Sequence, residues 1–583
     1  MSKVLELKGL LEQHTLAANV SYLYDNWQHQ RYEWMQEKIE LRKYLFATDT
    51  SKTSNSKLPW KNTTTRPKLT QIRDNLHANY MTALFPNDDW LRWEGYTQDA
   101  ETLSKKKAIT TYLSNKIKTS NFRDTVSQLL FDYIDYGNAF VDVEMMYEYK
   151  EDPETGERIP QFVGPKAKRI SPYDIVFNPL ATSFKDSPKI TRYIKSLGEV
   201  KKDLRTVAGS AYLEEIISKA EEVRRRSHAY TDADWAKASS YQVDGFGNLQ
   251  EYYQSDYVEI LEFEGDMYDS DTDTFLENHI ITIIDRSHVI RKEVSPRWLS
   301  GSGKAHCGWR KRPDTLWAMG PLDNLVGMQY RIDHLENLSA DAMDLAIHPP
   351  VVIAGSVEEF DWHPGAEIYA GEGGVVTELG KNLQGVIAAK QDIAALEAKM
   401  EELAGAPRET MGIRTPGEKT AFEVQSLMTA ASRIFQEKIT QFETELLEPL
   451  LNAMLEVARR HMDMSDVIRV MDDDFGVVEF LTVTKEDITA QGKIRPIGAR
   501  HFAAQAQLLQ GLTGVFNSPI GQMIQPHTSP KALTKLVEDS LGLERFSLFY
   551  DNAMIYENME TQKVMADAEE EVAVHATTPG LEG

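Results

Sequence analysis

Two kinds of hydrophobic pattern alternate along the first part of the chain. Residues 1–45, 69–84 and 101–136 carry apolar positions at helical spacing, and the charged segment 198–240 is also mostly helical in pattern. Apolar and polar residues alternate instead in four segments, at 139–149, 171–179, 257–269 and 279–294. This alternation predicts strands, and we expect the last two segments to pair as a β-hairpin.

After Pro313 the pattern changes to long helices. In residues 321–346 the apolar side chains fall on about one helical face, and aspartates lie off that face. The apolar positions are Leu322, Leu325, Ile332, Leu335, Leu338, Ala342 and Leu345, and the aspartates are Asp323, Asp333, Asp341 and Asp344. The sequence HPPVV ends this helix, and a β-rich insert (348–382) leads into a second helix (383–404).

A third helix is predicted from about Ala421 to His461. It would be about 60 Å long at 1.5 Å per residue, and Pro449 should kink it. A short β segment (467–483) and further helices from 498 to about 571 follow. Globular folds use so long a helix mainly as a spine or in an assembly. The whole pattern predicts an α+β fold that is mainly α.

Charge and cysteine content narrow the classes of function. The 583 residues include 64 Lys+Arg and 89 Asp+Glu, a net charge of −25, which would repel nucleic acid or membranes unless basic side chains gather in one place. Cys307 is the only cysteine, so the chain forms neither an intrachain disulfide nor a thiolate metal cluster. The N-terminus is amphipathic and acidic, and no run of about 18 apolar residues occurs. We therefore expect a soluble protein made in the cytoplasm.

The stretch GIRTPGEKTAFEV (412–424) nearly matches a nucleotide-binding loop. Gly412 and Gly417 have the right spacing, and Lys419 follows. However, Glu418 moves the lysine out of register and places a carboxylate where the pyrophosphate would lie, and Pro416 removes a backbone N–H. A helix precedes the loop where a buried strand is required. The sequence therefore argues against nucleotide binding.

Other stretches imitate ion or nucleotide sites only in part. The carboxylates of DSDTD (269–273) begin like a calcium loop, but the loop lacks the required glycine and final glutamate, so we expect a hairpin turn. HIITIID (279–285) is interpreted as a strand, GSGK (301–304) as a flexible turn, and DDD (472–474) as a solvated turn. No HExxH or GxSxG motif is present. We predict no enzyme, cofactor or metal site.

Several ordered segments resemble the portal, or head-to-tail connector, proteins of short-tailed bacteriophages. NLHANYMTALFPNDDWLRWEG (75–95) is similar to a helix, FP and tryptophan segment near the start of those proteins, and YGNAFVDVEM (136–145) to a Gly-Asn turn into a strand. SPYDIVFNP (171–179) resembles the segment that follows that strand. MGPLDNLVGMQYRIDHLENL (319–338) resembles a glycine-led stem helix, and the segment 414–455 an Arg-Thr-x-Gly-Glu loop that feeds a long helix broken at proline.

The resemblance implies a closed ring, a dodecamer in this family, around a DNA channel at one vertex of the virion capsid. It assigns a wing (1–320), stem helices (321–347 and 383–404), a clip (348–382), a channel loop (405–419), a long kinked helix that completes the wing (420–497), and a helical crown with the C-terminal tail (498–583). The implied partners are the major capsid protein, tail adaptor or nozzle proteins, the large terminase during packaging, and double-stranded DNA without sequence specificity. No membrane is implied.

Five residues become candidate contacts under this resemblance. Arg408, Arg414 and Lys419 in the channel loop would meet DNA phosphates without reading bases. An acidic conduit fits this role, because a strongly basic wall would hold DNA that must slide. Trp362 and Tyr369 in the clip are aromatic residues suited to an interface, here with the tail adaptor.

Four alternatives remain open. The channel loop could be a plain connection between helices whose arginines pair with Glu409 and Glu418, and Trp362 could be a local core residue. The protein could instead be an ATPase or nuclease of the packaging machinery. It could also be another phage structural subunit, such as a tail or adaptor protein.

Overall fold

The chain divides into two compact units. The first contains Met1–Thr82 and Leu91–Pro496, and the second contains Ala83–Trp90 and Ile497–Gly583. The computed structural model describes residues 4–7, 13–57, 61–85, 90–95, 100–151, 158–196, 198–199, 235, 257–284, 286, 288–297, 303–347, 351–355, 369, 371–378, 383–405, 434–462, 465–472, 477–488 and 492–496. The predicted helices after residue 498 and almost all of the segment 198–240 lie outside these residues. The elements below belong mainly to the first unit.

The N-terminal segment is a strand followed by separate helices. Strand β1 (Val4–Leu7) pairs in parallel with β7, and helices α1 (Gln13–His29) and α2 (Tyr32–Phe46) follow. The prediction of one helix over 1–45 is therefore wrong at β1 and at the break between α1 and α2. Pairing to a sheet edge overrides the helical pattern at β1. Between α1 and α2, Arg31 turns inward, and its guanidinium donates hydrogen bonds to the carbonyls of Pro172 and Tyr173 (2.5 Å each).

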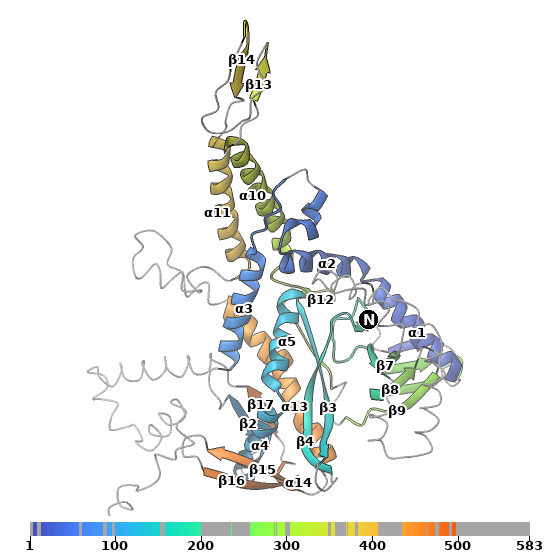
Figure 1. Ribbon diagram of the computed structural model, residues 1–583. Coiled ribbons are helices and arrows are strands. Elements are labelled where there is room, and N and C mark those ends of the chain that lie inside the picture. The colour runs from blue at the N-terminus through green and yellow to red at the C-terminus, as the bar shows by residue number, and fades with distance from the viewer. Residues whose placement is uncertain are drawn as a thin grey trace, which may run out of the picture. The chain divides into compact units, whose positions relative to one another are not determined.

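A six-stranded sheet packs against α1 (Figure 1). Its order is β5 (Ile175–Phe177), β6 (Lys189–Ser196), β7 (Tyr257–Asp269), β8 (Thr274–Ile284) and β9 (His288–Val294), with β1 beside β7. The strand and hairpin predictions for 171–179 and 257–284 are confirmed, but 279–294 forms parts of two strands. The DSDTD turn is also confirmed as a hairpin turn. Asp269 fixes it by accepting hydrogen bonds from the Asp271 N–H (3.1 Å) and the Thr272 hydroxyl (2.7 Å).

A three-stranded antiparallel sheet forms the centre of the first unit. Its order is β10 (Ala305–Gly308), β3 (Asn138–Glu151) and β4 (Arg158–Ile170). Helices α4 (Ala100–Thr119) and α5 (Phe122–Asp135) precede it, so the helix predicted over 101–136 is broken at Asn121, which has a left-handed φ of 53°. Asparagine is among the residues that most readily adopt this conformation.

The turn between α5 and β3 contacts the backbone at Gly320, in the segment that leads into helix α10. Gly137 has a φ of +72°, and a Cβ built on it would lie 2.4 Å from the backbone nitrogen of Gly320. Glycine is therefore required both by conformation and by space. After the β11 (Arg310–Arg312) and β12 (Thr315–Met319) pair, a 3₁₀ turn (Asp323–Leu325) leads into α10 (Val326–Ile347).

Helix α10 and helix α11 (Leu383–Leu403) confirm the two helices predicted on either side of the insert. Between them, β13 (Val351–Ala354) and β14 (Val375–Glu378) pair as an antiparallel ribbon, which confirms the β character of the described part of the insert. Helix α3 (Lys68–Leu84) matches the helix predicted over 69–84. Two 3₁₀ turns, Thr50–Lys52 and Ser54–Lys57, lie between α2 and α3.

The long C-terminal helix of this unit changes its winding before Pro449. The chain is helical from residue 434, passes through a π-helical turn (Glu443–Leu447) and continues as α13 (Glu448–His461). Because Pro449 has no N–H, a regular ladder of hydrogen bonds cannot pass through it, and the wider turn accommodates that gap. The predicted start near Ala421 lies outside the described residues. Strands β15 (Ser465–Asp472) and β16 (Val477–Thr484), helix α14 (Lys485–Ile488) and strand β17 (Gly492–Pro496) follow, and β17 pairs with β2 (Leu91–Gly95).

Candidate functional site

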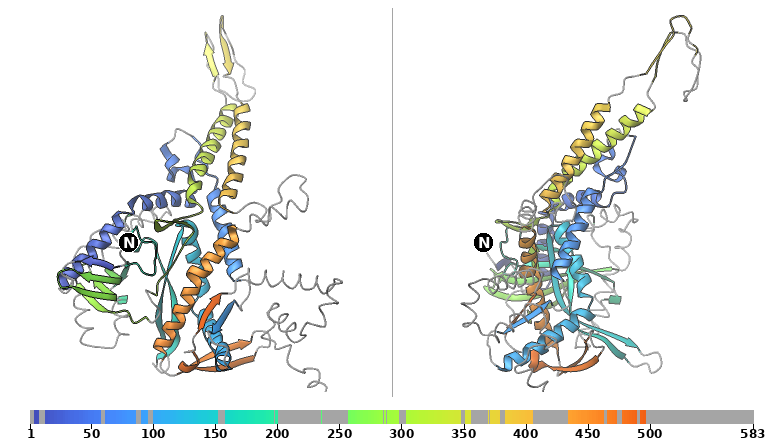
Figure 2. Two further views of the ribbon diagram at one scale, coloured as in Figure 1. Left: turned by 180° about the vertical axis from the view of Figure 1, so that it is seen from behind. Right: turned by 90° about the vertical axis from the view of Figure 1, so that its left-hand side faces the viewer.

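The most distinctive element of the first unit is a hairpin of two long helices. Helices α10 and α11 lie side by side and antiparallel, and the β13–β14 pair connects them (Figures 1 and 2). On α11, Val386, Ile393 and Met400 recur every seven residues and are buried. This spacing keeps one narrow face of α11 turned to α10, as in a coiled coil. We call the two helices and their ribbon the stalk.

An extended segment that precedes α3 runs along α10 and is held there by polar side chains. We call residues 61–68 the strap. The side chains on α10 that hold it are four residues apart and therefore share one face: Gln329, Asp333, Asn337 and Asp341. Asn337 is fully buried and bonds both backbone groups of Thr64, accepting from its N–H and donating to its carbonyl (2.8 Å each).

The same pattern continues above and below Asn337. Asp341 accepts from the backbone N–H of Asn62 (3.0 Å) and, with Asp344, from its side-chain amide (2.8 and 3.0 Å). Asp333 accepts from the backbone N–H of Arg66 (3.0 Å) and from the Thr65 hydroxyl (3.1 Å). Of the four aspartates that the sequence placed off the apolar face, Asp333 and Asp341 thus bind backbone N–H groups of the strap. Asp323 instead accepts hydrogen bonds from Lys38 and from the Gly320 N–H.

Cationic side chains of the strap reach across to α11. Arg66 lies between Glu336 on α10 (3.8 Å) and Glu397 on α11 (3.3 Å). Lys68 forms a buried ion pair with Glu401 on α11. The strap therefore joins both helices, so that its order and the packing of the stalk depend on each other.

Asp333 carries the chemically most perturbed charge of this contact. Burial raises the pKa of its carboxyl to about 6, although the hydrogen bonds from Arg66, Thr65 and Gln329 oppose the shift. The nearby Glu336 raises it further. Burial outweighs these hydrogen bonds, so the carboxyl of Asp333 titrates close to neutral pH.

The outer surface of the stalk remains apolar at several positions. Large apolar side chains are exposed on both helices and on the ribbon: Tyr330, Leu338, Met343, Leu345, Ile347, Val352, Val375, Ile387 and Leu403. So many exposed apolar groups on one element are typical of a surface that another protein covers. The strap covers only the polar face of α10, so these apolar side chains of the stalk stay exposed.

Of the five candidate contact residues, only Tyr369 is among the residues that the structure describes. Tyr369 lies between β13 and β14 in sequence, and 63% of it is exposed. Arg408, Arg414, Lys419 and Trp362 lie outside the described residues, as do Glu409 and Glu418. Whether the three cations gather in one place therefore stays a prediction, and so does the tail-adaptor role of Trp362 and Tyr369.

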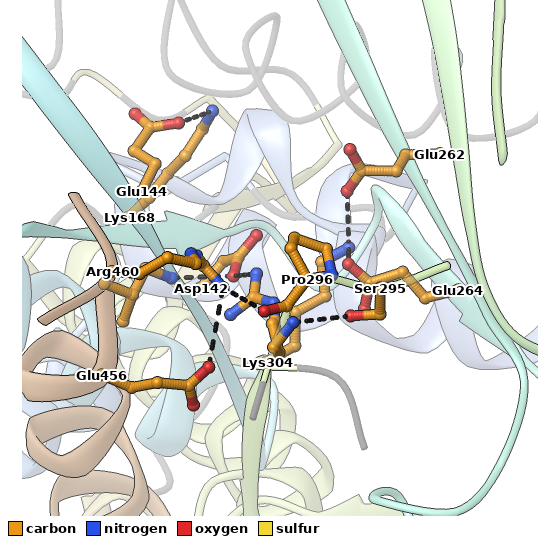
Figure 3. Close-up of polar contacts among 12 residues, drawn as sticks. Asp142, Glu144, Lys168, Glu262, Glu264, Ser295, Pro296, Lys304, Glu456 and Arg460 are labelled. Atoms are coloured by element: carbon orange, nitrogen blue, oxygen red, sulfur yellow. Dashed lines mark hydrogen bonds and ion pairs between the residues drawn. The ribbon is translucent and has the colours of Figure 1, made fainter. Parts of the chain in front are cut away.

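A buried ionic cluster joins the two main sheets of the first unit (Figure 3). Lys304, whose side chain is fully buried, donates to Glu262 (2.8 Å) and Glu264 (2.9 Å) on β7. Arg297 donates to Asp142 on β3 (2.9 Å). Of the turn predicted at GSGK, the structure describes only Gly303 and Lys304, and it adds that the Lys304 side chain is an anchor between elements. Sequence reasoning missed it because both glutamates lie about forty residues earlier, on β7.

Helix α13 reaches the same region through Arg460. Its guanidinium donates to the carbonyl of Pro296 (3.0 Å) and pairs with Glu456 one turn earlier (3.6 Å) (Figure 3). Burial lowers the pKa of Lys304, but Glu262 and Glu264 outweigh burial and hold it well above its usual value. A cluster whose acids and bases are paired in this way is a structural tie, because losing one partner would leave a buried charge uncompensated.

The described residues contain no group of three or more His, Cys, Asp or Glu side chains placed to hold a metal ion. No helix among them is both long and apolar enough to cross a membrane. Comparison of the chain with models of protein families and with curated proteins finds no match.

Proposed function

We propose that the chain is the subunit of a phage portal ring, through which double-stranded DNA is packaged and ejected and to which the tail attaches. The stalk carries this proposal. Two helices packed on each other through one narrow face leave large apolar side chains exposed elsewhere on the stalk, and cyclic assembly would bury those side chains against neighbours. The order of helix α10, the β ribbon, helix α11 and the long helix also follows the order of segments that resemble portal proteins in sequence.

The proposal assigns the stalk to the stem and the β13–β14 ribbon to the clip. The loop after α11 would line the channel, where Arg408, Arg414 and Lys419 contact phosphates. The chain as a whole carries a net charge of −25, so contacts to DNA would be weak and salt-sensitive. The proposed partners are the major capsid protein, the tail adaptor and the large terminase.

Assembly state is the first test. Native mass measurement and particle images of the purified chain should show a closed ring of about a dozen subunits with a stalk. Burial of exposed apolar surface at roughly 25 cal/mol per Å² drives such assembly, so it should persist at moderate salt. A stable monomer at micromolar concentration would contradict the proposal.

A second test distinguishes a portal subunit from a packaging enzyme and from a tail or adaptor subunit. The same preparation should neither hydrolyse ATP nor cleave DNA in the presence of divalent metal ions. Turnover in either assay would favour the packaging enzyme. Rings that assemble on capsids only after the tail is added would favour a tail or adaptor subunit.

A further inference from the structure

Helix α2 follows α1 after a short turn (Figure 1), and four buried polar atoms around this turn have no hydrogen-bond partner among the described residues. They are the Tyr24 hydroxyl oxygen, the Gln28 amide nitrogen, the Arg31 Nε and the Trp34 Nε1. The side chains of Tyr24, Gln28 and Arg31 are 0%, 2% and 5% exposed. Buried polar groups in folded proteins are normally hydrogen-bonded, so four such atoms in one short segment indicate that something else binds there.

The four groups belong to one cluster. Tyr24, Gln28 and Arg31 are four and three residues apart, so they follow one side of α1 and of the turn after it. The backbone N–H of Arg31 donates to the carbonyl of Gln28 (3.1 Å). The Arg31 guanidinium lies 5.9 Å from the centroid of the Trp34 ring, and Tyr24 lies within electrostatic range of Arg31.

Arg31 is a buried cation that forms no ion pair with another described residue. Its two terminal nitrogens donate to the backbone carbonyls of Pro172 and Tyr173 (2.5 Å each). Burial lowers the pKa of Arg31 to about 10, although Tyr24 and Asp174 oppose the shift. A buried charge is costly unless an opposite charge compensates it. The unused Nε–H of Arg31 is a donor that a small anion can occupy.

Two carboxylates influence the same place, and one of them is already neutralised. Burial raises the pKa of the Tyr24 hydroxyl most, and the carboxylates of Glu259 and Asp174 add to that shift. Glu259 accepts from Arg192 (2.6 Å) and from Arg286 (2.7 Å). The negative charge of Asp174 opposes an anion at this turn, so we expect a dissociation constant on the order of millimolar.

We propose that the turn between α1 and α2 is a binding site for a small inorganic anion, chloride in the experiments below. The anion accepts hydrogen bonds from the Nε–H of Arg31 and the Nε1–H of Trp34, and further ones from the Gln28 amide and the Tyr24 hydroxyl. Three of these four groups are N–H donors that cannot accept a hydrogen bond. A water molecule that accepts from them must still place its own two hydrogens, whereas an anion accepts without donating.

The site lies within one chain, so this inference does not depend on the proposed function. A bound anion would compensate the charge of Arg31 and satisfy donors from both helices. Its expected effect is therefore to stabilise the first unit of the folded chain.

The melting temperature of the wild-type chain in two salts tests the site. Sodium chloride is replaced by sodium gluconate at equal ionic strength, because gluconate is too large to enter a buried site. A ligand that binds only the folded chain stabilises it by mass action. The melting temperature should be higher in chloride by roughly 1–3 °C when chloride exceeds its dissociation constant about tenfold.

Two variants each remove one donor. Gln28→Met keeps an unbranched side chain of similar length, and Trp34→Phe keeps an aromatic ring. Both should lose most of the difference in melting temperature between chloride and gluconate. In gluconate, Gln28→Met should melt no lower than the wild type, because it removes a buried donor that has no partner. If Gln28 had only a structural role, its replacement would lower the melting temperature equally in both salts.

Trp93→Phe is the matched control. The Nε1 of Trp93 on β2 is also buried and without a hydrogen-bond partner among the described residues, but Trp93 is not part of the turn between α1 and α2. Its replacement should leave the chloride effect as large as in the wild type. An equal chloride effect in Gln28→Met, Trp34→Phe and the wild type would overturn the inference. So would a wild type that melts at the same temperature in both salts.

Anomalous diffraction from wild-type crystals grown in bromide locates the anion directly. We expect a peak at hydrogen-bond distance from the Nε of Arg31 and the Nε1 of Trp34. Bromide found only at exposed positions would overturn the inference. A chain that binds bromide at this turn but stays monomeric would support the anion site and contradict the proposed function.

Discussion

At the scale of single residues, Asp333 is the group whose titration should change the stability of the whole first unit. Its pKa is about 6 in the folded chain, against 3.8 as the ordinary value. Between these two values the folded chain holds more protons than the unfolded chain. Stability from this group is therefore fully present below about pH 4 and is lost as the pH rises through about 6.

The Asp333→Asn variant should lose that pH dependence. The shift from 3.8 to about 6 corresponds to at most about 3 kcal/mol of unfolding free energy. We expect the melting temperature of the variant to change less than that of the wild type between pH 5 and pH 7. Thermal unfolding at several pH values in that window measures the difference.

Asp341→Asn is the matched control, because Asp341 lies on the same helix and binds the same strap. Burial acts to raise the pKa of Asp341, but the hydrogen bonds from Asn62 and Lys61 together outweigh it and lower the pKa. Its carboxyl therefore stays ionised throughout the window from pH 5 to pH 7, and its replacement should not change the slope. Equal slopes for the wild type and Asp333→Asn would show that Asp333 is not the titrating group.

At the scale of elements, the strap and α10 should lose order together. Asn337→Leu removes both hydrogen bonds to the backbone of Thr64, whose N–H and carbonyl then turn to water because Thr64 is exposed. A loss of roughly 2 kcal/mol in unfolding free energy is expected, since each hydrogen bond contributes about 0.5–1.5 kcal/mol. Hydrogen exchange of a peptide covering residues 61–68 should become faster.

Arg331→Gln offers a control on the same helix. It removes only an ion pair between half-exposed side chains (3.9 Å), and exchange in the strap should not change. If Asn337→Leu leaves the exchange of the strap as slow as in the wild type, the backbone contacts of Thr64 do not hold the segment in place.

Helical periodicity predicted the stalk helices well because their packing is local. Val386, Ile393 and Met400 carry the pattern within one segment, and the aspartates of α10 are visibly outside it. What those aspartates bind could not be predicted, because the strap lies more than 260 residues away in sequence. The breaks at Arg31 and Asn121 were missed for a related reason: each depends on one residue whose conformation is set by its surroundings and not by periodicity.

The positions of the predicted contact residues could not be derived from periodicity. Arg408, Arg414 and Lys419 were chosen from a family resemblance, and no periodic pattern fixes where their loop points. Lys304 was interpreted as part of a turn because its neighbours are glycine and serine. Its two partners on β7 become visible only when the sheets are placed together.

At the scale of the whole molecule, the clip should connect the ring to the tail. Trp362→Ala and Tyr369→Ala are each expected to reduce tail attachment while rings still form, because aromatic side chains supply much of the binding energy in interfaces. Counting tailed particles against purified rings measures this effect. Tyr369 is 63% exposed, so its truncation should not affect folding. Loss of soluble protein in Trp362→Ala would instead place Trp362 in a local core.

The channel loop should influence DNA and not assembly. In a ring, Arg408, Arg414 and Lys419 would form circles of positive charge, and replacing all three with Ala should leave rings intact but impair packaging or let packaged DNA leak. Ring melting and packaged DNA length are measured together. A destabilised ring that contains full-length DNA would show that Arg414 pairs with Glu418 at the helix start and would exclude the channel role.

The strap also constrains the order in which the chain can fold. Its partners on α10 lie 263 to 282 residues later, so at roughly 5–20 residues per second a nascent chain waits on the order of tens of seconds before they emerge from the ribosome. Strand β1 waits similarly for β7. The strap sequence KNTTTRPK is polar and contains no apolar side chain except that of Pro67, so it can remain hydrated during synthesis without attracting other nascent chains. The polar composition of the strap thus disfavours aggregation during the long interval before its partner on α10 is synthesised.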